Sequence, residues 1–554
     1  MSNAARAWEK WYDEDAKKFD VEKSLKHQSI PAAVRAAAAE FGNAPAFSIV
    51  LPQGQSASID FSELDEHSDA FAGYCVDVLK IQRGDVVAIQ APNCLGYLVA
   101  LFGALKAGAI ISNVNPLYTA NETVRQLRDC GAKALVGFDL FGEELDKVVN
   151  AGVNVPIVTL SAFDFFPSWQ RMTLGFAAKH IKRMIPKMTT PVTPLAEALR
   201  QGARSSAILE GREITGDETC FYQYSGGTTG QSKGVMLTAR GHLINIAQFS
   251  ALNPGTISVK GRTGILVLPL YHVFGLYVSL INVLFGGHTV LVPNPRPLSN
   301  LKKAFEKFPP EVFPGVNTLF AGLLAQPWFQ ENPPTSLELT VTGATALKES
   351  VREDWAALTG SEIIDSYGMT ESTTVVATSP IGERNRPGTV GIPLPGTDMR
   401  LVDGDGKVVP VGERGEIQIK GPQVTKGYLN AAETTQNAFD NGWLRTGDVG
   451  VFDEDGYLRI VDRVKDMVIV SGFNVFPNEV ENIVMGLDGV ADVGVVGRPD
   501  PVSGEAVVAC VVRSSETLSA EDVIAHCRDH LTAYKVPKDI RFVDQLPKTP
   551  VGKV

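Results

Sequence analysis

The sequence predicts an α/β protein: a large N-terminal domain of stacked sheets and helices, with a β-rich subdomain, followed by a small α+β domain. Three observations predict this fold class. The chain has 554 residues, more than one ordinary hydrophobic core accommodates. Strand-like runs alternate with helical patterns through its first part, which is typical of parallel sheets covered by helices. The residue pattern becomes turn-rich and strand-like near Pro387, and it changes to a compact α+β pattern after Arg463.

The first part of the chain shows the alternation clearly. Val86–Gln90 is rich in β-branched residues and ends at a turn. Tyr97–Lys106 has a helical pattern that stops before Gly108, a typical C-terminal signal. Further strands are expected at Ala109–Val114, Ala134–Gly137 and Pro156–Leu160.

The segment Thr263–Pro295 carries no charged residue and is long enough to suggest a membrane span. Pro269 and the Gly286-Gly287 pair interrupt it, so we interpret it as buried elements of a globular core. The expected elements are a strand at Gly264–Leu268, a helix at Leu276–Phe285 and a strand at Thr289–Val292.

The later part of the chain predicts two further units. Residues 387–462 are turn-rich and are expected to form the β-rich subdomain of an N-terminal domain that spans residues 1–462. Its strands are expected at Gly391–Val402, Gly415–Lys420, Gly447–Phe452 and Gly456–Val461. Residues 463–554 have their own apolar content and are expected to form a separate domain. Its strands are expected at Met467–Val470, Ala491–Val496 and Ala506–Val512, and its helices near Pro477–Met485 and Ala520–Leu531.

Composition limits the function classes. The net charge is −11, from 51 Lys+Arg and 62 Asp+Glu, so nucleic acid is not expected as a partner. The six cysteines include no CxxC pair, so neither a zinc site nor a disulfide framework is indicated. The N-terminus lacks an apolar signal core, and the expected location is therefore the cytoplasm.

A glycine-rich loop is the strongest local signal for function. Phosphate binding needs accessible backbone N–H groups, hydroxyl donors and a cation. All three occur in the run Tyr224-Ser225-Gly226-Gly227-Thr228-Thr229-Gly230-Gln231-Ser232-Lys233-Gly234. Phe221–Tyr224 before it is strand-like, and Gly241–Phe249 after it is helix-like. Lys233 is not followed by Ser or Thr, so the loop is not a Walker A motif, which disfavours P-loop kinases and GTPases. An isolated run of this kind would more simply be a flexible polar loop.

Five further motifs follow the loop. They are Tyr367-Gly368-Met369-Thr370-Glu371, Trp443-Leu444-Arg445-Thr446-Gly447-Asp448, Asp462-Arg463-Val464-Lys465-Asp466, Ser471-Gly472-Phe473-Asn474-Val475-Phe476-Pro477 and Lys548-Thr549-Pro550-Val551-Gly552-Lys553. With the loop, they resemble the adenylate-forming superfamily of acyl- and aryl-CoA synthetases, peptide-synthetase adenylation domains and luciferases. The resemblance runs from about Ala46 to the C-terminus. Two positions depart from it: Ser232, where many members have Pro, and Thr342-Gly343-Ala344, where Gly-Gly-Ala is common.

The resemblance implies an ATP site. It assigns the phosphates to the loop residues Tyr224, Ser225, Gly226, Gly227, Thr228, Thr229, Gly230 and Lys233. It places Tyr367 against adenine, with Gly343 in the wall around it. Thr370 is implied to contact the α-phosphate and Glu371 to hold Mg²⁺. Asp448 and Arg463 are implied to contact the ribose.

The resemblance also implies a mobile C-terminal domain and two half-reactions. Lys553 aligns with the lysine of the adenylation step, in which the carboxylate attacks the α-phosphate of ATP and pyrophosphate leaves. Lys465 aligns with the hinge about which the domain turns. Gly472 aligns with the glycine that lets the arm of coenzyme A pass before its thiol attacks the acyl-adenylate.

Other segments indicate the substrate. Asn113–Thr119, Gly315–Phe320 and Gly472–Glu481 resemble the bacterial long-chain fatty-acid CoA ligases. The resemblance places at the acyl pocket His272, Phe274, Gly315 and Val316, with a positional role for the histidine. The alternatives that stay open are a medium-chain or aryl-CoA ligase, an acyl-AMP ligase that loads a carrier protein, and a fatty-acid-capturing protein with a relic site.

The segment Phe165–Ala196 contains basic and aromatic residues but no Asp or Glu. On an acidic protein it suits peripheral contact with anionic lipid at the inner face of the membrane, where the fatty acid is dissolved. A solvated helix with one packed face is an equal alternative. The sequence does not give the oligomeric state, and a homodimer is compatible with it.

Overall fold

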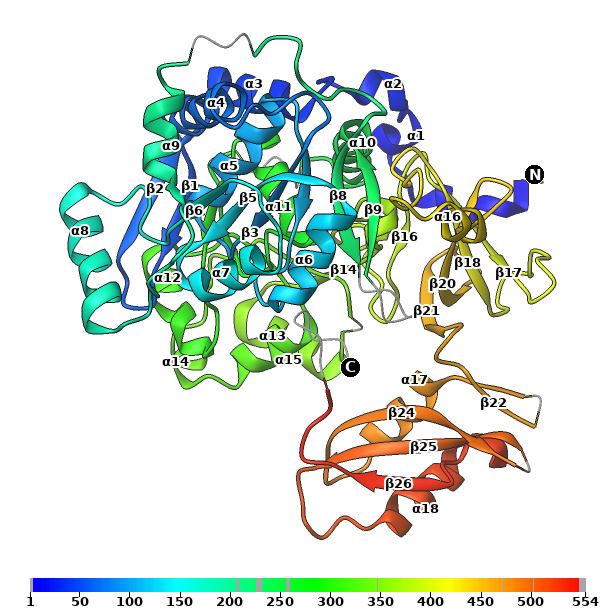
Figure 1. The fold of residues 1–554 in the computed structure, drawn as a ribbon. Coiled ribbons are helices and arrows are strands. Elements are labelled where there is room, and N and C mark those ends of the chain that lie inside the picture. The colour runs from blue at the N-terminus through cyan, green and yellow to red at the C-terminus, as the bar shows by residue number, and fades with distance from the viewer. Residues whose placement is uncertain are drawn as a thin grey trace.

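The computed structural model describes residues 3–205, 209–225, 232–255, 260–345, 347–471, 473–501 and 503–547. Within these ranges the chain forms a large body with two extended sheets, a smaller β-sheet beside them and an α+β unit at the C-terminal end (Figure 1). The predicted fold class is confirmed.

A seven-stranded sheet carries the first βαβ region. Its order is β7-β6-β5-β3-β4-β8-β9, and its neighbouring strands are parallel except for the antiparallel pair β8 and β9. The strands are β3 (Val86–Gln90), β4 (Ile110–Asn113), β5 (Ala132–Phe138), β6 (Ile157–Leu160), β7 (Thr193–Pro194), β8 (Thr219–Ser225) and β9 (Lys233–Thr238). The connecting helices include α6 (Ala120–Asp129), α7 (Gly142–Asn150) and α9 (Leu195–Gly202). The strands expected between Val86 and Leu160 are all present.

A nine-stranded sheet forms the second layer. Its order is β16-β15-β14-β13-β12-β10-β11-β1-β2, parallel in the centre and antiparallel towards both edges. The strands are β1 (Pro45–Val50), β2 (Ser56–Asp60), β10 (Thr263–Leu266), β11 (His288–Leu291), β12 (Val312–Gly315), β13 (Leu339–Thr342), β14 (Ile363–Tyr367), β15 (Ala377–Thr378) and β16 (Ile392–Pro393). Its helices include α3 (Ile30–Phe41), α10 (Ala239–Leu252), α11 (Val273–Phe285), α12 (Lys302–Lys307), α13 (Asn317–Leu324), α14 (Pro327–Glu331) and α15 (Glu349–Thr359).

The charge-free segment folds as expected. It contributes β10, α11 and β11 to the core of this layer, so its apolar character serves burial within the protein. In the part of the chain that the structure describes, no helix has both the length and the apolar character that a bilayer crossing requires.

Helix α5 (Leu95–Lys106) lies between the two sheets, since it packs on β1 of one and on β3 and β4 of the other. All of its residues are buried. A helix without a solvent face must be apolar on all sides, and that is the character of its sequence. Its single charge, Lys106, lies 2.5 Å from Asp65 and 2.7 Å from Asp69 on the neighbouring helix α4 (Phe61–Asp77), measured from Nζ to Oδ1. The two carboxylates compensate the burial of the ammonium.

The β-rich region forms a five-stranded sheet. Its strands are β17 (Asp398–Val402), β18 (Gly415–Lys420), β19 (Phe439–Asp440), β20 (Trp443–Phe452) and β21 (Leu458–Arg463), and α16 (Ala432–Ala438) precedes β19. The N-terminal segment packs against this sheet, because Trp8 stacks on Phe452 with ring centroids 5.2 Å apart. The expected strand Gly391–Val402 is split: β16 joins the nine-stranded sheet and β17 joins this one.

The C-terminal unit has a separate sheet and a separate apolar core (Figure 1). Its elements are β22 (Val468–Val470), β23 (Phe473–Val475), α17 (Pro477–Met485), β24 (Val490–Asp500), β25 (Gly504–Arg513), α18 (Ala520–His530) and β26 (Asp539–Phe542). The expected strands and helices of this region are all present, and β24 is longer than expected because it pairs with β25 along nearly its whole length.

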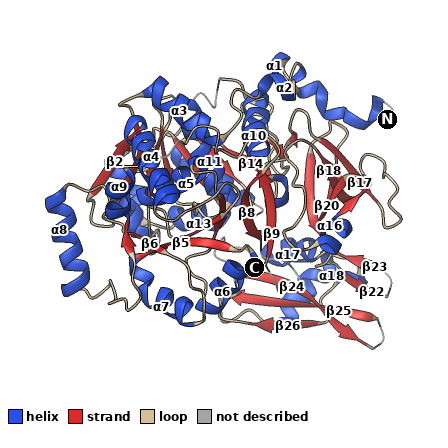
Figure 2. Ribbon diagram, turned by 45° about the horizontal axis from the view of Figure 1, so that its top comes forward, coloured by secondary structure: helices blue, strands red, loops and turns tan. Residues whose placement is uncertain are grey.

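Helix α8 (Ser168–Phe176) and the turn of π-helix that follows it lie at the periphery of the body in both ribbon views (Figures 1 and 2). No residue of α8 is buried.

Candidate nucleotide and acyl-binding site

The glycine-rich loop connects two strands of the seven-stranded sheet. β8 ends at Ser225 and β9 begins at Lys233, and these two residues are paired in the antiparallel register. The expected strand and helix are present, but an additional strand, β9, lies between the loop and α10. This strand is not apparent from the sequence because Lys233–Thr238 is short and continues directly into the helix, which Thr238 caps. Gly226, Gly227, Thr228, Thr229 and Gly230 lie outside the described residues.

The first residues of the loop are anchored from the neighbouring helix. Tyr224, the penultimate residue of β8, donates a hydrogen bond from its hydroxyl to Asp129 Oδ2 at 2.5 Å. Asp129 ends α6, and its backbone carbonyl accepts a 2.9 Å hydrogen bond from Asn430 Nδ2. These contacts fix the position at which the chain enters the loop.

Glu371 is a buried carboxylate that contacts the end of β8. It lies in a short 3₁₀ turn after β14, and the residue is 8% exposed. Its Oε1 accepts hydrogen bonds from Ser225 Oγ at 3.4 Å and from Tyr428 Oη at 3.0 Å. Burial raises the pKa of its carboxyl above the ordinary value.

This environment fits a divalent cation. Within the described ranges, Glu371 takes part in no ion pair, and a buried carboxylate is stabilised by a cation. Those same ranges contain no cluster of three or more His, Cys, Asp or Glu residues that could hold a metal alone. Mg²⁺ typically binds through one or two carboxylates together with phosphate oxygens and water, and one carboxylate next to a phosphate loop meets that requirement.

Tyr428 was missed in the sequence analysis. It lies between β18 and α16, in a segment that backbone hydrogen bonds of 2.8 and 3.0 Å pair with β9. Its hydroxyl reaches Glu371, and its ring faces Lys233, whose Nζ lies 5.8 Å from the ring centroid. Tyr428 therefore connects the predicted metal ligand with the predicted phosphate-binding lysine. The available signal was a Gly-Tyr pair in a loop, which carries no charge or motif of its own.

Tyr367, Asp448 and Arg463 lie together, as expected for residues that share one ligand. Tyr367 Oη donates to Asp448 Oδ2 at 2.7 Å, and Arg463 Nε lies 3.3 Å from Asp448 Oδ1. Asp448 and Arg463 are paired in register on β20 and β21, whereas Tyr367 ends β14 of another sheet. Burial raises the pKa of Tyr367, so its hydroxyl stays protonated and continues to donate.

The turn that carries Thr370 and Glu371 is sterically constrained. A Cβ at Gly368 would lie 1.6 Å from the carbonyl oxygen of Thr374, so only glycine fits there. Thr373 has φ of +66°, which is unusual for a β-branched residue. Its hydroxyl donates to the carbonyl of Gln423 at 2.6 Å, and this contact helps to hold the turn in place.

The loop after β13 has features typical of a ligand-binding loop. At Gly343, a Cβ would lie 3.3 Å from both the ring of Phe274 and the carbonyl oxygen of Ser366. Ala344 has φ of +68°, and among the residues that the structure describes the buried hydroxyl of Thr345 has no hydrogen-bond partner. Strained backbone and unpaired buried polar groups concentrate at functional sites.

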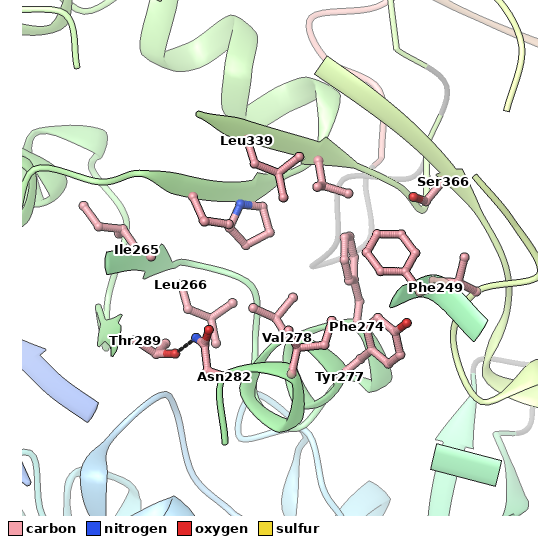
Figure 3. A pocket seen from close by; sticks show the side chains of 16 residues that line it. Phe249, Ile265, Leu266, Phe274, Tyr277, Val278, Asn282, Thr289, Leu339 and Ser366 are labelled. Atoms are coloured by element: carbon pink, nitrogen blue, oxygen red, sulfur yellow. Dashed lines mark hydrogen bonds between the residues drawn. The ribbon is translucent and has the colours of Figure 1, made fainter. Parts of the chain in front are cut away.

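An apolar cavity of about 60 Å³ lies between α11 and the nine-stranded sheet (Figure 3). Ser366, which directly precedes Tyr367, lies at one end of it. Phe274, predicted for the acyl pocket, is in its wall. Gly315 and Val316 follow Pro314, which also lines it. The lining residues are Phe249, Gly264, Ile265, Leu266, Phe274, Tyr277, Val278, Ile281, Asn282, Thr289, Val312, Pro314, Leu339, Val341, Ser366 and Val375.

His272 is the N-cap of α11, where its Nδ1 accepts a hydrogen bond from the backbone N–H of Phe274 at 3.3 Å. The preceding residue, Tyr271, accepts a 2.6 Å hydrogen bond at its carbonyl from Gln223 Nε2 of β8. These contacts join the start of α11, next to the cavity, to the strand that enters the glycine-rich loop.

The segment between the body and the C-terminal unit contains the predicted hinge residue. Lys465 is partly exposed, and its Nζ lies 3.8 Å from Asp466 Oδ1. Asp462 is buried, and its carboxylate accepts hydrogen bonds from the backbone N–H groups of Arg463 at 2.7 Å and Asn478 at 2.9 Å. Gly472 and Lys553 lie outside the described residues.

Two family models match the chain. One is described as AMP-binding enzyme and covers residues 34–429, and the other is the AMP-binding enzyme C-terminal domain, at residues 479–553. A long-chain-fatty-acid–CoA ligase of Haemophilus influenzae is 41% identical over 99% of this chain and 97% of its own length. The protein of that name from Escherichia coli O6:H1 is 41% identical over 96% and 93%. ATP-bound MatB from Rhodopseudomonas palustris, a crystal structure, superposes with a TM-score of 0.79 at 28% identity and covers 95% of this chain and 97% of that one.

Two sheet layers, a small β-sheet and a terminal α+β unit are the architecture of adenylate-forming enzymes. The chain belongs to the AMP-binding enzyme family. The resemblance identified from the six motifs is thereby confirmed.

The constraint at Gly368 gives a prediction. Gly368→Ala places a methyl group against the Thr374 carbonyl, so the turn with Thr370 and Glu371 must move. We expect ATP affinity, measured by calorimetry, to fall at least about tenfold, equivalent to about 1.4 kcal/mol. Gly404→Ala is the matched control, because a Cβ at that residue would have no atom within 4 Å. Unchanged affinity in Gly368→Ala would contradict the constraint.

Proposed function

We propose that this chain activates a long-chain fatty acid with ATP, forming an acyl-adenylate and pyrophosphate, and then transfers the acyl group to coenzyme A with release of AMP. The observation that carries the proposal is the apolar cavity that ends at Ser366, one residue from Tyr367 of the nucleotide cluster. An apolar cavity stabilises a hydrocarbon chain by about 0.8 kcal/mol for each buried methylene. The names of the relatives at 41% identity support the same substrate class.

We assign the nucleotide to the cluster around the hairpin. The β- and γ-phosphates are held by residues of the glycine-rich loop, namely Tyr224, Ser225, Gly226 to Gly230, and Lys233. Thr370 contacts the α-phosphate, and Tyr367 and Gly343 contact the adenine. Asp448 accepts hydrogen bonds from the ribose hydroxyls while Arg463, 3.3 Å away, keeps its carboxylate in position.

Glu371 is the residue that we assign to Mg²⁺. The bound ion would neutralise phosphate charge near the reacting phosphorus. The chain's own contribution is to hold the Glu371 carboxylate in a fixed position through Ser225 and Tyr428. These two hydrogen bonds also lower the pKa of its carboxyl, against the larger rise that burial causes.

The second half-reaction needs a different face of the C-terminal unit. We assign the hinge to Lys465, the adenylation step to Lys553 and the passage of the coenzyme A arm to Gly472. The contacts between body and unit are compatible with rotation, since they include the partly exposed ion pair of Arg414 with Glu479 at 3.4 Å and the stacking of Arg414 over Phe476 at 4.7 Å. Contacts of this kind contribute little free energy and can be exchanged.

A substrate panel tests the proposal. AMP release would be measured with ATP, Mg²⁺ and coenzyme A on saturated acids of increasing length, on benzoate, and on acids with a carrier protein in place of coenzyme A. We expect kcat/KM to rise with chain length into the long-chain range. A maximum on benzoate or on a medium-chain acid would favour an aryl- or medium-chain ligase, and activity that requires the carrier protein would favour a loading enzyme. No AMP release with any acid would favour a capturing protein.

Tyr428 gives a second test of the site. Tyr428→Phe removes the hydroxyl that donates to Glu371 but keeps the ring near Lys233, so we expect weaker holding of the Glu371 carboxylate. The apparent Mg²⁺ affinity, followed by Mg²⁺-dependent protection of ATP-bound enzyme against thermal unfolding, should fall about threefold to tenfold, which is the effect of losing a hydrogen bond with a net contribution of about 1 kcal/mol. Tyr457→Phe, which removes a hydroxyl bonded to the Arg384 carbonyl, is the control. Equal protection in Tyr428→Phe and Tyr457→Phe would argue against the assignment.

We further propose that the enzyme acts in the cytoplasm and contacts anionic lipid through α8 and the residues that follow it. Large apolar side chains are exposed along this segment: Trp169 (65%), Met172 (71%), Phe176 (59%), Ile181 (70%) and Met184 (52%). The basic residues of the same segment have no acidic neighbour in sequence. Exposed apolar groups flanked by cations are typical of helices that lie at a membrane interface.

Vesicle binding tests this contact. Charge reversal of Lys179, Lys182 and Arg183 should weaken binding to phosphatidylglycerol vesicles by at least about tenfold, since each cation near an anionic surface contributes about 1 kcal/mol. Phosphatidylcholine vesicles should bind weakly in all cases. Reversal of Lys17, Lys18 and Lys23 is the control, because these exposed residues lie at α1 (Glu14–Lys17) and α2 (Val21–Ser24), away from α8 (Figure 1). Equal loss from both sets would show a general charge effect and contradict a role of α8.

A further inference from the structure

We propose that Asn282 and Thr289 close the far end of the acyl cavity and set the longest acyl chain that the site accepts. This inference rests on the proposed fatty-acid substrate and adds the residues that determine its length.

The two residues are the polar pair at the end of the cavity opposite Ser366. Figure 3 shows Ser366 at one side, near Phe274, and the hydrogen-bonded Asn282 and Thr289 at the other. Asn282 lies eight residues after Phe274 on α11, about 12 Å further along the helix. An acyl group whose carboxyl carbon is at the nucleotide cluster therefore points its methyl end towards this pair.

The pair joins the helix to the sheet. Asn282 Nδ2 donates to Thr289 Oγ1, so α11 is tied to β11 at this point. Both residues are buried, with 7% of Asn282 and 1% of Thr289 exposed. The hydrogen bond satisfies two polar groups in apolar surroundings, and separating them would leave both unpaired.

The helix is also fixed directly after Asn282. The backbone carbonyl of Asn282 accepts hydrogen bonds from Gly286 and Gly287 N–H, and Gly286 ends α11 in the left-handed conformation. A Cβ at Gly286 would lie 2.6 Å from the ring of Phe41 on α3, so the end of α11 is held against another helix. The far end of the cavity is therefore less able to widen than its middle.

A cavity of about 60 Å³ must widen to hold a long hydrocarbon chain. The middle of α11 lines it with Val278 and Ile281, and apolar side chains can change rotamer without loss of hydrogen bonds. At Asn282, by contrast, widening breaks the contact with Thr289. The acyl chain can therefore extend as far as this pair and no further.

Two substitutions of Asn282 test the proposed limit on acyl-chain length in opposite directions. Asn282→Ala opens the far end, and Asn282→Phe fills it. Ser279→Ala is the matched control, because Ser279 is buried on the same helix, bonds the Gly275 carbonyl at 3.0 Å and does not line the cavity. The readout is kcat/KM for AMP release over the panel of saturated acids.

We expect Asn282→Ala to move the maximum to longer acids. Asn282→Phe should move it to shorter ones, because each excluded methylene lowers kcat/KM by about fourfold. Ser279→Ala should keep the parent profile. Parent-like profiles in both Asn282 variants would overturn the proposal, whereas a parent enzyme that prefers benzoate would instead overturn the proposed function.

Cross-linking of the unsubstituted protein provides an independent measurement. A fatty acid that carries a photoreactive diazirine at its methyl end, at the length the parent enzyme prefers, should label the peptides that contain Asn282 or Thr289. Labelling confined to other peptides would overturn the proposal even if Asn282→Phe failed to fold.

Discussion

The carboxylate of Glu371 is the point at which elements from the three sheets of the body meet. Ser225 comes from the seven-stranded sheet, Glu371 follows the last long strand of the nine-stranded sheet, and Tyr428 comes from the loop that leaves the five-stranded sheet. A buried carboxylate requires hydrogen-bond donors, so this one group connects the regions that supply them. The position at which the chain enters the glycine-rich loop, relative to the nucleotide cluster, depends on that demand, because Ser225 is the last residue of β8.

The hydrogen bonds at Glu371 require the two sheet layers to keep a fixed separation, and α5 provides this. Being buried on all sides between the two sheets, α5 holds the layers at a fixed separation, and α11 packs within the same core. Gln223 of β8 then bonds the Tyr271 carbonyl, just before the His272 cap of α11. The apolar cavity and the strand that enters the glycine-rich loop are thus positioned by one connected set of contacts, as the proposed reaction between a carboxylate and an α-phosphate requires.

Much of the fold was predictable because its signals are local. The βαβ alternation, the turn-rich region and the terminal α+β unit each follow from hydrophobic periodicity and turn residues. The charge-free segment was correctly interpreted as a strand, a helix and a strand, because proline and glycine interrupt it. The strand β9 was missed because six residues between a loop and a helix carry too little periodicity. For the site, the motifs gave Tyr367, Asp448 and Arg463, which the structure brings together. Tyr428 and the Asn282–Thr289 pair were not found, since their importance arises from contacts across sheets and at the end of a cavity that no local pattern encodes.

The contacts within the body differ in kind from the contacts between the body and the C-terminal unit. The body joins its regions through the buried groups Glu371 and Thr373, the half-buried Tyr367, and the buried pair Asn282 and Thr289. The C-terminal unit has a closed core of its own, and its contacts with the body include partly exposed charged side chains such as Arg414 with Glu479. Buried hydrogen bonds are costly to break, whereas exposed ion pairs exchange with water at little cost in free energy. A ligase that performs two chemistries at one site needs this division, because the acyl-adenylate must remain in place while the surface facing it is replaced.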